Sequence, residues 1–469
     1  MSSRLPDYVA SALPVPKEKR MPWFASTAQT YAGIMLWFVF WESVPISAST
    51  PGGILAQGLG AALIGVVLAG FICHFASYWA PAMMGMKTGL PLAVVGTSTY
   101  GVQGGFLMPG FFMGILQFGW LAVNSYFSAM LLAGFVGRPE GSAMHMAIGV
   151  IWALVAAFVG LKGIQYVAKV ATFLPLIPFV LMLILLGKTA GGIGNFDPSQ
   201  LTAGAVADSL PSSTNLMLLA IANIVGFFAT AGAAGVDIAS SNRDEKDVQL
   251  GGLVGVAGAV IFTGCLALLI VAGTYGSGLM EGKEVILKPT ALMETIMGAG
   301  TAKIFWLLLA IAAFPPACFS SLIAAASFRN TLPKVNPFVS CGIGTAASIA
   351  LVVSGKAGDA AAVFGVIGAS FGPICGAMTA DYILSGMKWP GPRSGFNMAG
   401  WISWAVGFVV GAFGFFGPRL GTEFQMPCPP VAAIIVGFVL YAVLAKLGLE
   451  STQLEMPAAE EAPAEPAAE

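Results

Sequence analysis

Apolar residues in this chain run in unbroken blocks of about 20 positions, separated by short polar stretches. A helix needs about 20 apolar residues to cross the hydrocarbon of a bilayer, so each block predicts one membrane-spanning helix. No block alternates apolar and polar residues in the manner of a membrane β-barrel. The pattern therefore predicts an all-α polytopic membrane protein with about twelve transmembrane helices, near residues 27–50, 54–79, 103–136, 143–161, 166–187, 212–239, 249–274, 303–328, 336–355, 358–385, 398–417 and 428–448.

The Lys and Arg residues between the spans predict the orientation of the chain. With the N-terminus inside, about 14 of the 21 fall on the cytoplasmic side and about 7 on the other. Cytoplasmic loops carry such an excess, so both termini are expected in the cytoplasm of a protein in the cytoplasmic (inner) membrane. Residues 1–24 are polar, without the apolar run of a signal peptide. Residues 25–450 form the membrane domain, and residues 451–469 are expected to be a disordered acidic tail.

Composition removes several classes of function. Hydrophobic residues make up 57% of the chain and charged residues 9%, whereas a soluble protein has roughly 25% charged residues. A net charge of −1 leaves no broad basic surface for nucleic acid. Two His and six Cys, with no C-x-x-C pair, do not form the pattern of a metal or thiol enzyme. We expect no catalytic residues, no cofactor, no certain metal site and no obligate protein partner; the lipid bilayer and a small molecule remain as partners.

Two of the predicted spans look interrupted. The first carries Pro45, which removes a backbone donor and breaks a helical ladder. The sixth contains Gly226, Gly232 and Gly235. Broken helices five spans apart are typical of secondary transporters built from inverted repeats, in which the breaks hold substrate and ion near the midplane. The alternative is that Gly and Pro are simply common in membrane helices.

Five motifs follow one another along the chain in a recognisable order. Gly85–Phe127 contains a K-T-G-L loop, a [ST]-x-G-V-x-G turn and a helix with Q-x-G-W; the others are SASTPGG (47–53), VGFFATAGAAGVD (225–237), FGPICGAMTADYIL (371–384) and GFNMAGWISW (395–404). The ordered set resembles the nucleobase–cation symporter-1 family (the purine/cytosine permease family), with its cytosine permeases the nearest. This resemblance implies a five-plus-five inverted-repeat core of the leucine-transporter type, with two further helices.

Candidate substrate residues lie on the third and sixth spans. Gln117 and Trp120 share one helix face, with Asn124 one turn further. A flat heterocycle needs an aromatic ring to stack on and an amide that both donates and accepts hydrogen bonds. Phe228 matches the family's second stacking ring, whereas Phe227 is expected in the core. The alternative places Trp120 in lipid and bonds Gln117 to a neighbouring helix.

Glu42 departs from the family pattern. A carboxylate within a span is costly if it faces lipid, so it should face a cavity or a partner. It could carry a proton, bind a cation or pair with a substrate amine; alternatively, it is a structural acid held by amides near the break at Pro45.

The eighth span departs in the opposite sense. The resemblance implies Ser or Thr hydroxyls there for sodium, but this chain has Pro315 and Pro316 and no Ser, Thr or Asn between 306 and 319. The coupling ion is therefore Na⁺ or H⁺. Ser320 on this span and Ser47 at the end of the first span are further candidate substrate contacts.

Two aspartates, Asp237 and Asp381, end the sixth and tenth spans on the cytoplasmic side. They are interpreted as gate or structural residues that cap helices or pair with cations such as Arg243 or Lys388.

Taken together, these features favour a secondary active transporter that imports a nucleobase or related planar heterocycle by cation-coupled alternating access. A cytosine-like substrate is favoured over the others. The alternatives are another cargo on the same fold (a purine, hydantoin, allantoin or hydroxymethylpyrimidine), an amine or amino acid bound through Glu42, or a channel or receptor that does not transport.

Overall fold

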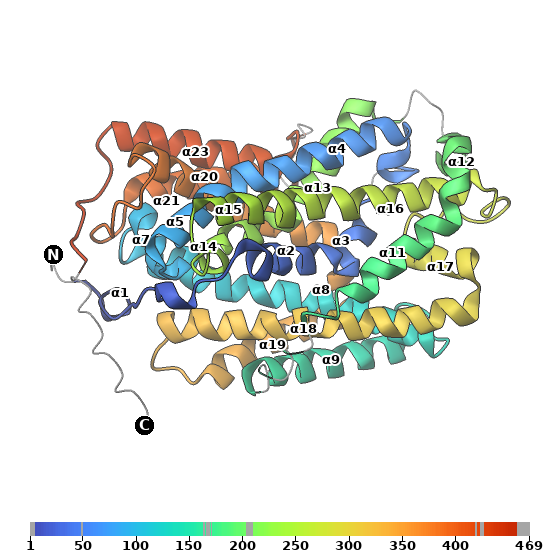
Figure 1. The fold of residues 1–469 in the computed structure, drawn as a ribbon, viewed down its shortest axis with the longest axis horizontal. Helices are drawn as coiled ribbons and strands as arrows, with labels where there is room; N and C mark the ends of the chain where they lie inside the picture. Colours follow the sequence, from blue (N-terminus) through green and yellow to red (C-terminus); the bar gives the residue numbers. More distant parts are fainter. Residues whose placement is uncertain are drawn as a thin grey trace.

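The computed structural model describes residues 5–47, 50–162, 165, 169, 171–202, 210–417, 420–422 and 426–456. Its long helices run side by side along one axis, and both ends of the chain lie at the same end of the bundle, called here the termini end (Figure 1). The opposite end, called here the distal end, carries α12 (Ser199–Thr202) and α17 (Pro289–Met297). An even number of spans is consistent with this arrangement.

Nine long apolar helices are candidate membrane spans within the described residues. Two shorter apolar helices, α19 (Pro337–Val353) and α21 (Met398–Gly411), and a first span in two pieces bring the set to the predicted twelve. The described residues form no β-strand, only two isolated bridges, which confirms the all-α prediction. The long spans are α4–η4–α5 (Leu59–Thr88), η5–α8 (Phe106–Phe135), α9 (Ala143–Lys162), α11–η6 (Leu176–Asn195), α13 (Ser213–Ala233), α15–η8–α16 (Glu245–Gly276), α18 (Ala299–Thr331), α20 (Ala360–Leu384) and α23 (Pro429–Lys446).

The first span breaks earlier than its sequence indicates. Helix α2 (Thr27–Leu36) stops at Trp37, whose backbone is extended (φ −60°, ψ 125°), and α3 (Phe38–Ser43) follows. The Leu36 carbonyl accepts a hydrogen bond from the Trp41 indole, 3.1 Å away, so a side chain satisfies a carbonyl at the break. Pro45 lies beyond α3, where its own carbonyl accepts the N–H of Ile54. The expected break at Pro45 is therefore wrong: this proline follows the span, and aromatic packing marks the break instead.

The sixth span is interrupted inside its Gly-rich stretch, as predicted. Helix α13 ends at Ala233, and the short α14 (Gly235–Ala239) begins after Ala234. The two interrupted spans contact each other, because the Tyr31 hydroxyl on α2 donates to the Ala231 carbonyl at 2.8 Å.

Segments from both ends of the chain are tied to the termini end. From the N-terminal side, the Tyr8 hydroxyl donates to the Val102 carbonyl at 2.5 Å, and the Met21 N–H to Ser241 at 2.7 Å. From the C-terminal side, the Leu454 N–H donates to the Pro392 carbonyl at 2.7 Å. Residues 451–456, the start of the expected tail, are thus hydrogen-bonded to the loop before α21. Residues 457–469 of that tail lie outside the described part of the chain.

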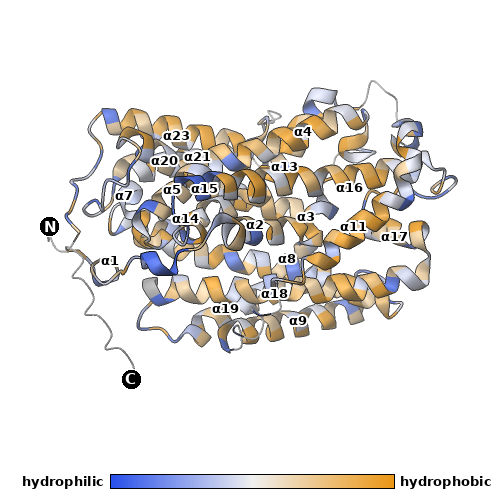
Figure 2. Ribbon diagram, in the orientation of Figure 1, coloured by the Kyte–Doolittle hydropathy of each residue, from blue (hydrophilic) through white to orange (hydrophobic). Residues whose placement is uncertain are grey.

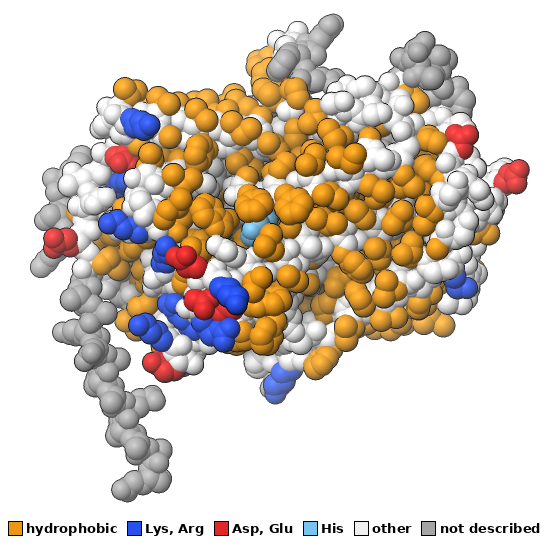
Figure 3. Space-filling view, turned by 45° about the horizontal axis from the view of Figure 1, so that its top comes forward, with side chains coloured by type: hydrophobic (Ala, Val, Ile, Leu, Met, Phe, Trp, Pro, Cys, Tyr) orange, Lys and Arg blue, Asp and Glu red, His pale blue; other side chains and the backbone are white. Residues whose placement is uncertain are grey.

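Apolar side chains dominate the lateral surface. Hydrophobic colour covers the length of the helices, and hydrophilic residues gather at the bundle's ends (Figure 2). The space-filling view shows the same division, with most Lys, Arg, Asp and Glu toward the two ends of the face in view (Figure 3). Ile64, Ile151, Phe158 and Ile343 are each at least 55% exposed on this surface. So much exposed apolar surface fits lipid as the surrounding solvent.

Close helix contact predicts a specific sensitivity. Helix α20 packs against α23, and a Cβ added at Gly376 would overlap the backbone of Ile434. We expect Gly376→Ala to destabilise the fold by about 1–3 kcal/mol, because neighbouring backbone cannot yield as a flexible side chain can. Gly365→Ala on the same helix is the matched control, since its Cβ meets nothing within 4 Å. Thermal unfolding in detergent tests this; equal midpoints for the two variants contradict it.

Candidate functional site

Four aromatic rings meet where the first span breaks. Trp37 at the break, Trp120 on α8, Phe227 on α13 and Phe364 on α20 form what we call the aromatic cluster. Ring centroids are 4.9 Å apart for Trp120–Phe227, 5.1 Å for Trp120–Phe364 and 5.9 Å for Trp37–Trp120. These are separations of direct contact. A flat ligand would have to part these rings in order to enter between them.

Trp120 is half-buried and fixed in orientation. Its indole N–H donates to the hydroxyl of Thr230 on α13 at 3.1 Å, across the two helices. Trp37 differs: its indole nitrogen is buried and has no hydrogen-bond partner among the described residues. The aromatic cluster thus holds one anchored ring and one buried donor with unused capacity.

Gln117 lies one turn before Trp120 on α8 and is 7% exposed. Its Nε2 donates to the Met113 sulfur at 3.4 Å. A thioether is a weak acceptor, so the amide keeps capacity for a stronger partner. The predicted pairing of a ring and an amide on one face of the third span is therefore present in the structure.

Glu42 lies apart from this cluster, on the distal half of the first span. It is 1% exposed, and neither carboxylate oxygen makes a hydrogen bond with a described residue. Thr290 at the start of α17 lies beside it, and the charges of Lys288 and Glu140 act on it across space. A basic residue does therefore approach Glu42, which the sequence alone did not suggest, because Lys288 belongs to a distant loop.

The chain matches, over residues 14–388, the family described as permeases for cytosine/purines, uracil, thiamine and allantoin. It belongs to that family. The match spans the helices that carry the aromatic cluster and Glu42. No curated protein matches the chain significantly.

Solved structures place this permease among known transporters of the same fold. It resembles Mhp1, a nucleobase-cation-symport-1 family transporter, in a closed conformation with bromovinylhydantoin bound, with TM-score 0.62, 15% identity, and 94% of this chain and 95% of that chain covered. It also resembles the inward-facing conformation of Mhp1, with TM-score 0.64, 17% identity, and coverage of 95% and 96%. A Na⁺-coupled sialic acid symporter in a substrate-bound outward-open state matches with TM-score 0.56, 12% identity, and coverage of 96% and 93%. The permease is thus a multi-pass membrane transporter by family and fold.

The structure places Phe227, not Phe228, against Trp120. Phe227 is buried in the core, as expected, but it also contacts Trp120, whereas Phe228, expected as the second stacking ring, packs against Tyr31 at 5.6 Å. Successive residues on a helix point about 100° apart, so only one of the two can face α8. The sequence left that rotation undetermined, and the structure does not bring Phe228 to Trp120.

Asn124 is used for packing between helices. Its Nδ2 donates to the Ala313 carbonyl of α18 at 2.9 Å, and its Oδ1 accepts from the Trp152 indole of α9 at 3.1 Å. The Ser128 hydroxyl adds a third bond. Asn124 therefore joins three helices through bonds to the protein itself.

The eighth span stays continuous through its two prolines. Pro315 and Pro316 lie inside α18, and because neither has an N–H, the carbonyls of Ile311 and Ala312 lose their helical donors. Ser320 is 6% exposed, and its hydroxyl donates to the Pro316 carbonyl at 3.3 Å. This bond occupies the Ser320 proton within its own helix.

Ser47 is half-buried near the distal end of the first span, beyond α3. The preceding Ile46 carbonyl accepts from the Asn223 amide on α13 at 3.4 Å. Ala48 and Ser49, within the SASTPGG motif, lie outside the described residues. Ser47 is thus ten residues beyond the break at Trp37, after α3 has ended.

Two predicted ion pairs are replaced by other contacts at the termini end. Asp381 pairs with Arg393 at 2.9 Å, not with Lys388. Arg243 pairs with Asp247 at 2.7 Å. Asp237 accepts the Leu92 N–H at 2.7 Å and so tethers α14 to the start of α6 (Leu92–Val95). Asp381 and Asp237 both connect elements at this end, as their interpretation as structural residues requires.

The sequence interpretation missed several residues that shape the site. Trp37, Phe364 and Thr230 belong to the aromatic cluster or anchor it, and Arg393 neutralises Asp381. Trp37 is flanked by neither Gly nor Pro, so no local signal marked the break. Arg393 could have been found as the loop cation nearest to Asp381 in sequence after Lys388.

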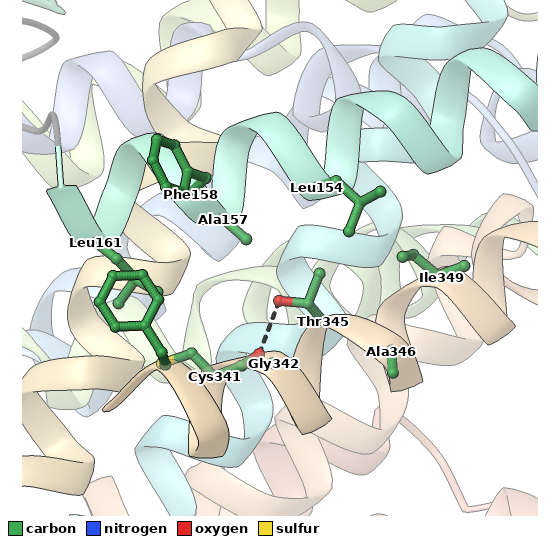
Figure 4. Close-up of a pocket in the computed structure, with 10 residues that line it drawn as sticks. Leu154, Ala157, Phe158, Leu161, Cys341, Gly342, Thr345, Ala346 and Ile349 are labelled. Atoms are coloured by element: carbon green, nitrogen blue, oxygen red, sulfur yellow. Dashed lines mark hydrogen bonds between the residues drawn. The ribbon is translucent and has the colours of Figure 1, made fainter. Parts of the chain in front are cut away.

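A shallow groove of about 220 Å³ lies elsewhere, between α9 and α19 (Figure 4). Leu154, Phe158 and Phe338 on its rim are 42–61% exposed, so it opens on the lateral apolar surface. The Thr345 hydroxyl is bonded to the Cys341 carbonyl at 2.7 Å. The groove thus lacks the pairing of ring and amide found at Trp120.

Proposed function

We propose that this permease imports a nucleobase or related planar heterocycle by cation-coupled alternating access, and that a cytosine-like substrate is favoured. The aromatic cluster beside Gln117, at the break of the first span, is the observation that carries this proposal. Membership of the family, whose description includes cytosine, purines, uracil and allantoin, supports it. The excess of Lys and Arg at the termini end supports a cytoplasmic-membrane protein with both termini inside.

In the proposed mechanism, the substrate parts Trp120 from its neighbouring rings and stacks on it. Each ring contact contributes on the order of 1 kcal/mol. Gln117 bonds the edge of the heterocycle with both its donor and its acceptor, and the unpartnered Trp37 N–H supplies a second donor. These edge contacts select among bases more strongly than stacking, because a lost hydrogen bond leaves a buried polar group unpaired.

The coupling ion in this proposal is Na⁺ or H⁺. A hard cation needs several oxygen ligands, and on α18 these are carbonyls released by Pro315 and Pro316. Glu42 is the acid we assign to coupling. Binding of the ion favours the substrate-competent state and so supplies the driving force.

Thermal stabilisation of the purified protein tests the proposal. We expect a flat heterocycle to raise the unfolding temperature, by mass action on the folded state, in a panel of cytosine, uracil, purines, hydantoins, allantoin, amines and amino acids. Each ligand is tested with and without sodium and at two pH values, which identifies the coupling ion. Stabilisation by amines or amino acids alone contradicts the proposal. Uptake of the stabilising ligand into proteoliposomes then separates a transporter from a channel or receptor.

A further inference from the structure

Glu42, on α3, lies beside the start of α17, a short helix at the distal end. Helix α17 follows Lys288, and no side chain caps its N-terminus. Pro289 has no N–H, and the N–H groups of Ala291 and Leu292 bond the Lys288 carbonyl. Thr290, which follows Pro289, is the residue beside the Glu42 carboxylate. Glu42 on α3 therefore faces the first turn of α17.

The carboxylate is enclosed without the partners that an ion needs. Both oxygens are buried and meet hydrogen-bond geometry with no described residue, although the N–H and hydroxyl of Thr290 act on them as neighbouring polar groups. An ionised carboxylate buried in this way is expensive unless it is paired and hydrogen-bonded, whereas its protonated form is far cheaper to bury. The enclosed arrangement thus favours a neutral Glu42.

The charges around Glu42 do not supply that pairing. Lys288 is engaged with Glu140, with 3.7 Å between Nζ and Oε2, and both side chains are more than a third exposed. The other helices packed on α3 are α2, α13 and α16, and within their bounds they contain no Asp, Glu, Lys, Arg or His. Their tyrosines are engaged, Tyr31 with the Ala231 carbonyl and Tyr275 with Ile286.

We propose that Glu42 makes closure of the distal end under α17 conditional on proton uptake. When α17 is lifted, Glu42 is wet and ionised; it takes one proton from solvent on that side, and the neutral acid is then buried as α17 closes. Reopening exposes the acid and returns the proton. This inference deepens the proposed function, on which it rests for the direction of transport, by assigning a proton to the distal gate.

Cysteine accessibility under α17 tests the inference without any substrate. Met293 on α17 is fully buried, so Met293→Cys reports when the helix lifts. We expect the rate at which a thiol reagent labels this cysteine to rise between about pH 6 and about pH 9. The rise should be several-fold larger in protein that keeps Glu42 than in protein with Glu42→Gln, because the glutamine stays neutral at every pH. The ratio of the two rates removes the thiol's own pH dependence. Four of the six native cysteines are buried, and the parent protein gives the background.

Two further measurements keep the test decisive. Glu294→Gln is the matched control, because it removes an exposed acid on α17 itself and leaves the Lys288–Glu140 pair in place, and it should retain the pH response. Hydrogen exchange of residues 285–298 in protein with native Met293 repeats the comparison if the cysteine disturbs packing. A rate ratio that does not change with pH in either measurement overturns the inference.

Uptake assays separate this inference from the proposed function. If a heterocycle is transported, Glu42→Gln should abolish the dependence of uptake on external pH while substrate-induced thermal stabilisation persists. If no heterocycle is bound or transported but the accessibility ratio still follows pH, the proposed function fails and the proton-dependent closure stands.

Discussion

Binding of a flat heterocycle should fall by about thirtyfold or more when Trp120 is replaced by alanine, equivalent to a loss of about 2 kcal/mol. Trp120 contacts three other rings and is anchored by Thr230, so its removal takes away the stacking surface and leaves that hydroxyl without its indole partner. The dissociation constant of the stabilising ligand, measured by calorimetry on purified protein, is the readout.

Two variants separate loss of stacking from loss of folding. Trp120→Phe keeps an aromatic face but removes the N–H, so it should lose less affinity than alanine. Trp404→Ala removes a half-buried tryptophan on α21, which packs on Phe112 and Phe408 outside the aromatic cluster. If Trp404→Ala weakens binding as much as Trp120→Ala, the stacked position of the substrate is refuted.

The fold itself should be most sensitive at Asp381. This carboxylate is fully buried and accepts hydrogen bonds from Ser98 at 2.6 Å and Thr99 at 3.0 Å while paired with Arg393. Burial opposes the charge on Arg393, but the charge of Asp381 helps hold the pKa of the guanidinium above its usual value. Asp381→Asn leaves that buried charge short of a partner, and we expect a loss of about 3–5 kcal/mol.

The surface provides a matched comparison for this effect. Glu245 pairs with Lys87 at 2.9 Å, but their side chains are 57% and 31% exposed. Glu245→Gln should cost about 1 kcal/mol or less. Thermal unfolding in detergent compares the variants, and the double variant Asp381→Asn with Arg393→Gln should recover part of the loss. If Asp381→Asn and Glu245→Gln unfold at the same temperature, the buried pair of Asp381 and Arg393 does not carry the stability assigned to it.

Much of the fold could be predicted because membrane insertion imposes a length and a composition on each span. The twelve blocks and the Gly-rich interruption before Gly235 follow from these constraints. The shape of the first span does not. Pro45 is a strong local breaker, yet the helix breaks at Trp37, where rings from two other helices, α8 and α13, pack. Tertiary packing decides that position, and a single sequence carries no record of it.

The candidate site was predictable in its residue types more than in its geometry. Gln117 and Trp120 share a face because spacing within one helix fixes it. The choice between Phe227 and Phe228 depends on the rotation of α13 relative to α8, which no spacing supplies. Likewise, Asn124 is one turn from Trp120, but its partners come from α9 and α18, and these distant contacts give it a packing role.

The contacts of Arg393 also impose an order on biosynthesis. Its Asp381 partner leaves the ribosome before it, but Tyr441 and Glu450, at 3.2 Å and 2.7 Å, are translated later. Until the twelfth span is inserted, a cation destined for burial has only part of its compensation. A nascent chain halted before Tyr441 would therefore retain a recognisable defect at the termini end, which a membrane quality-control protease could sense, and full maturation would await synthesis of Glu450.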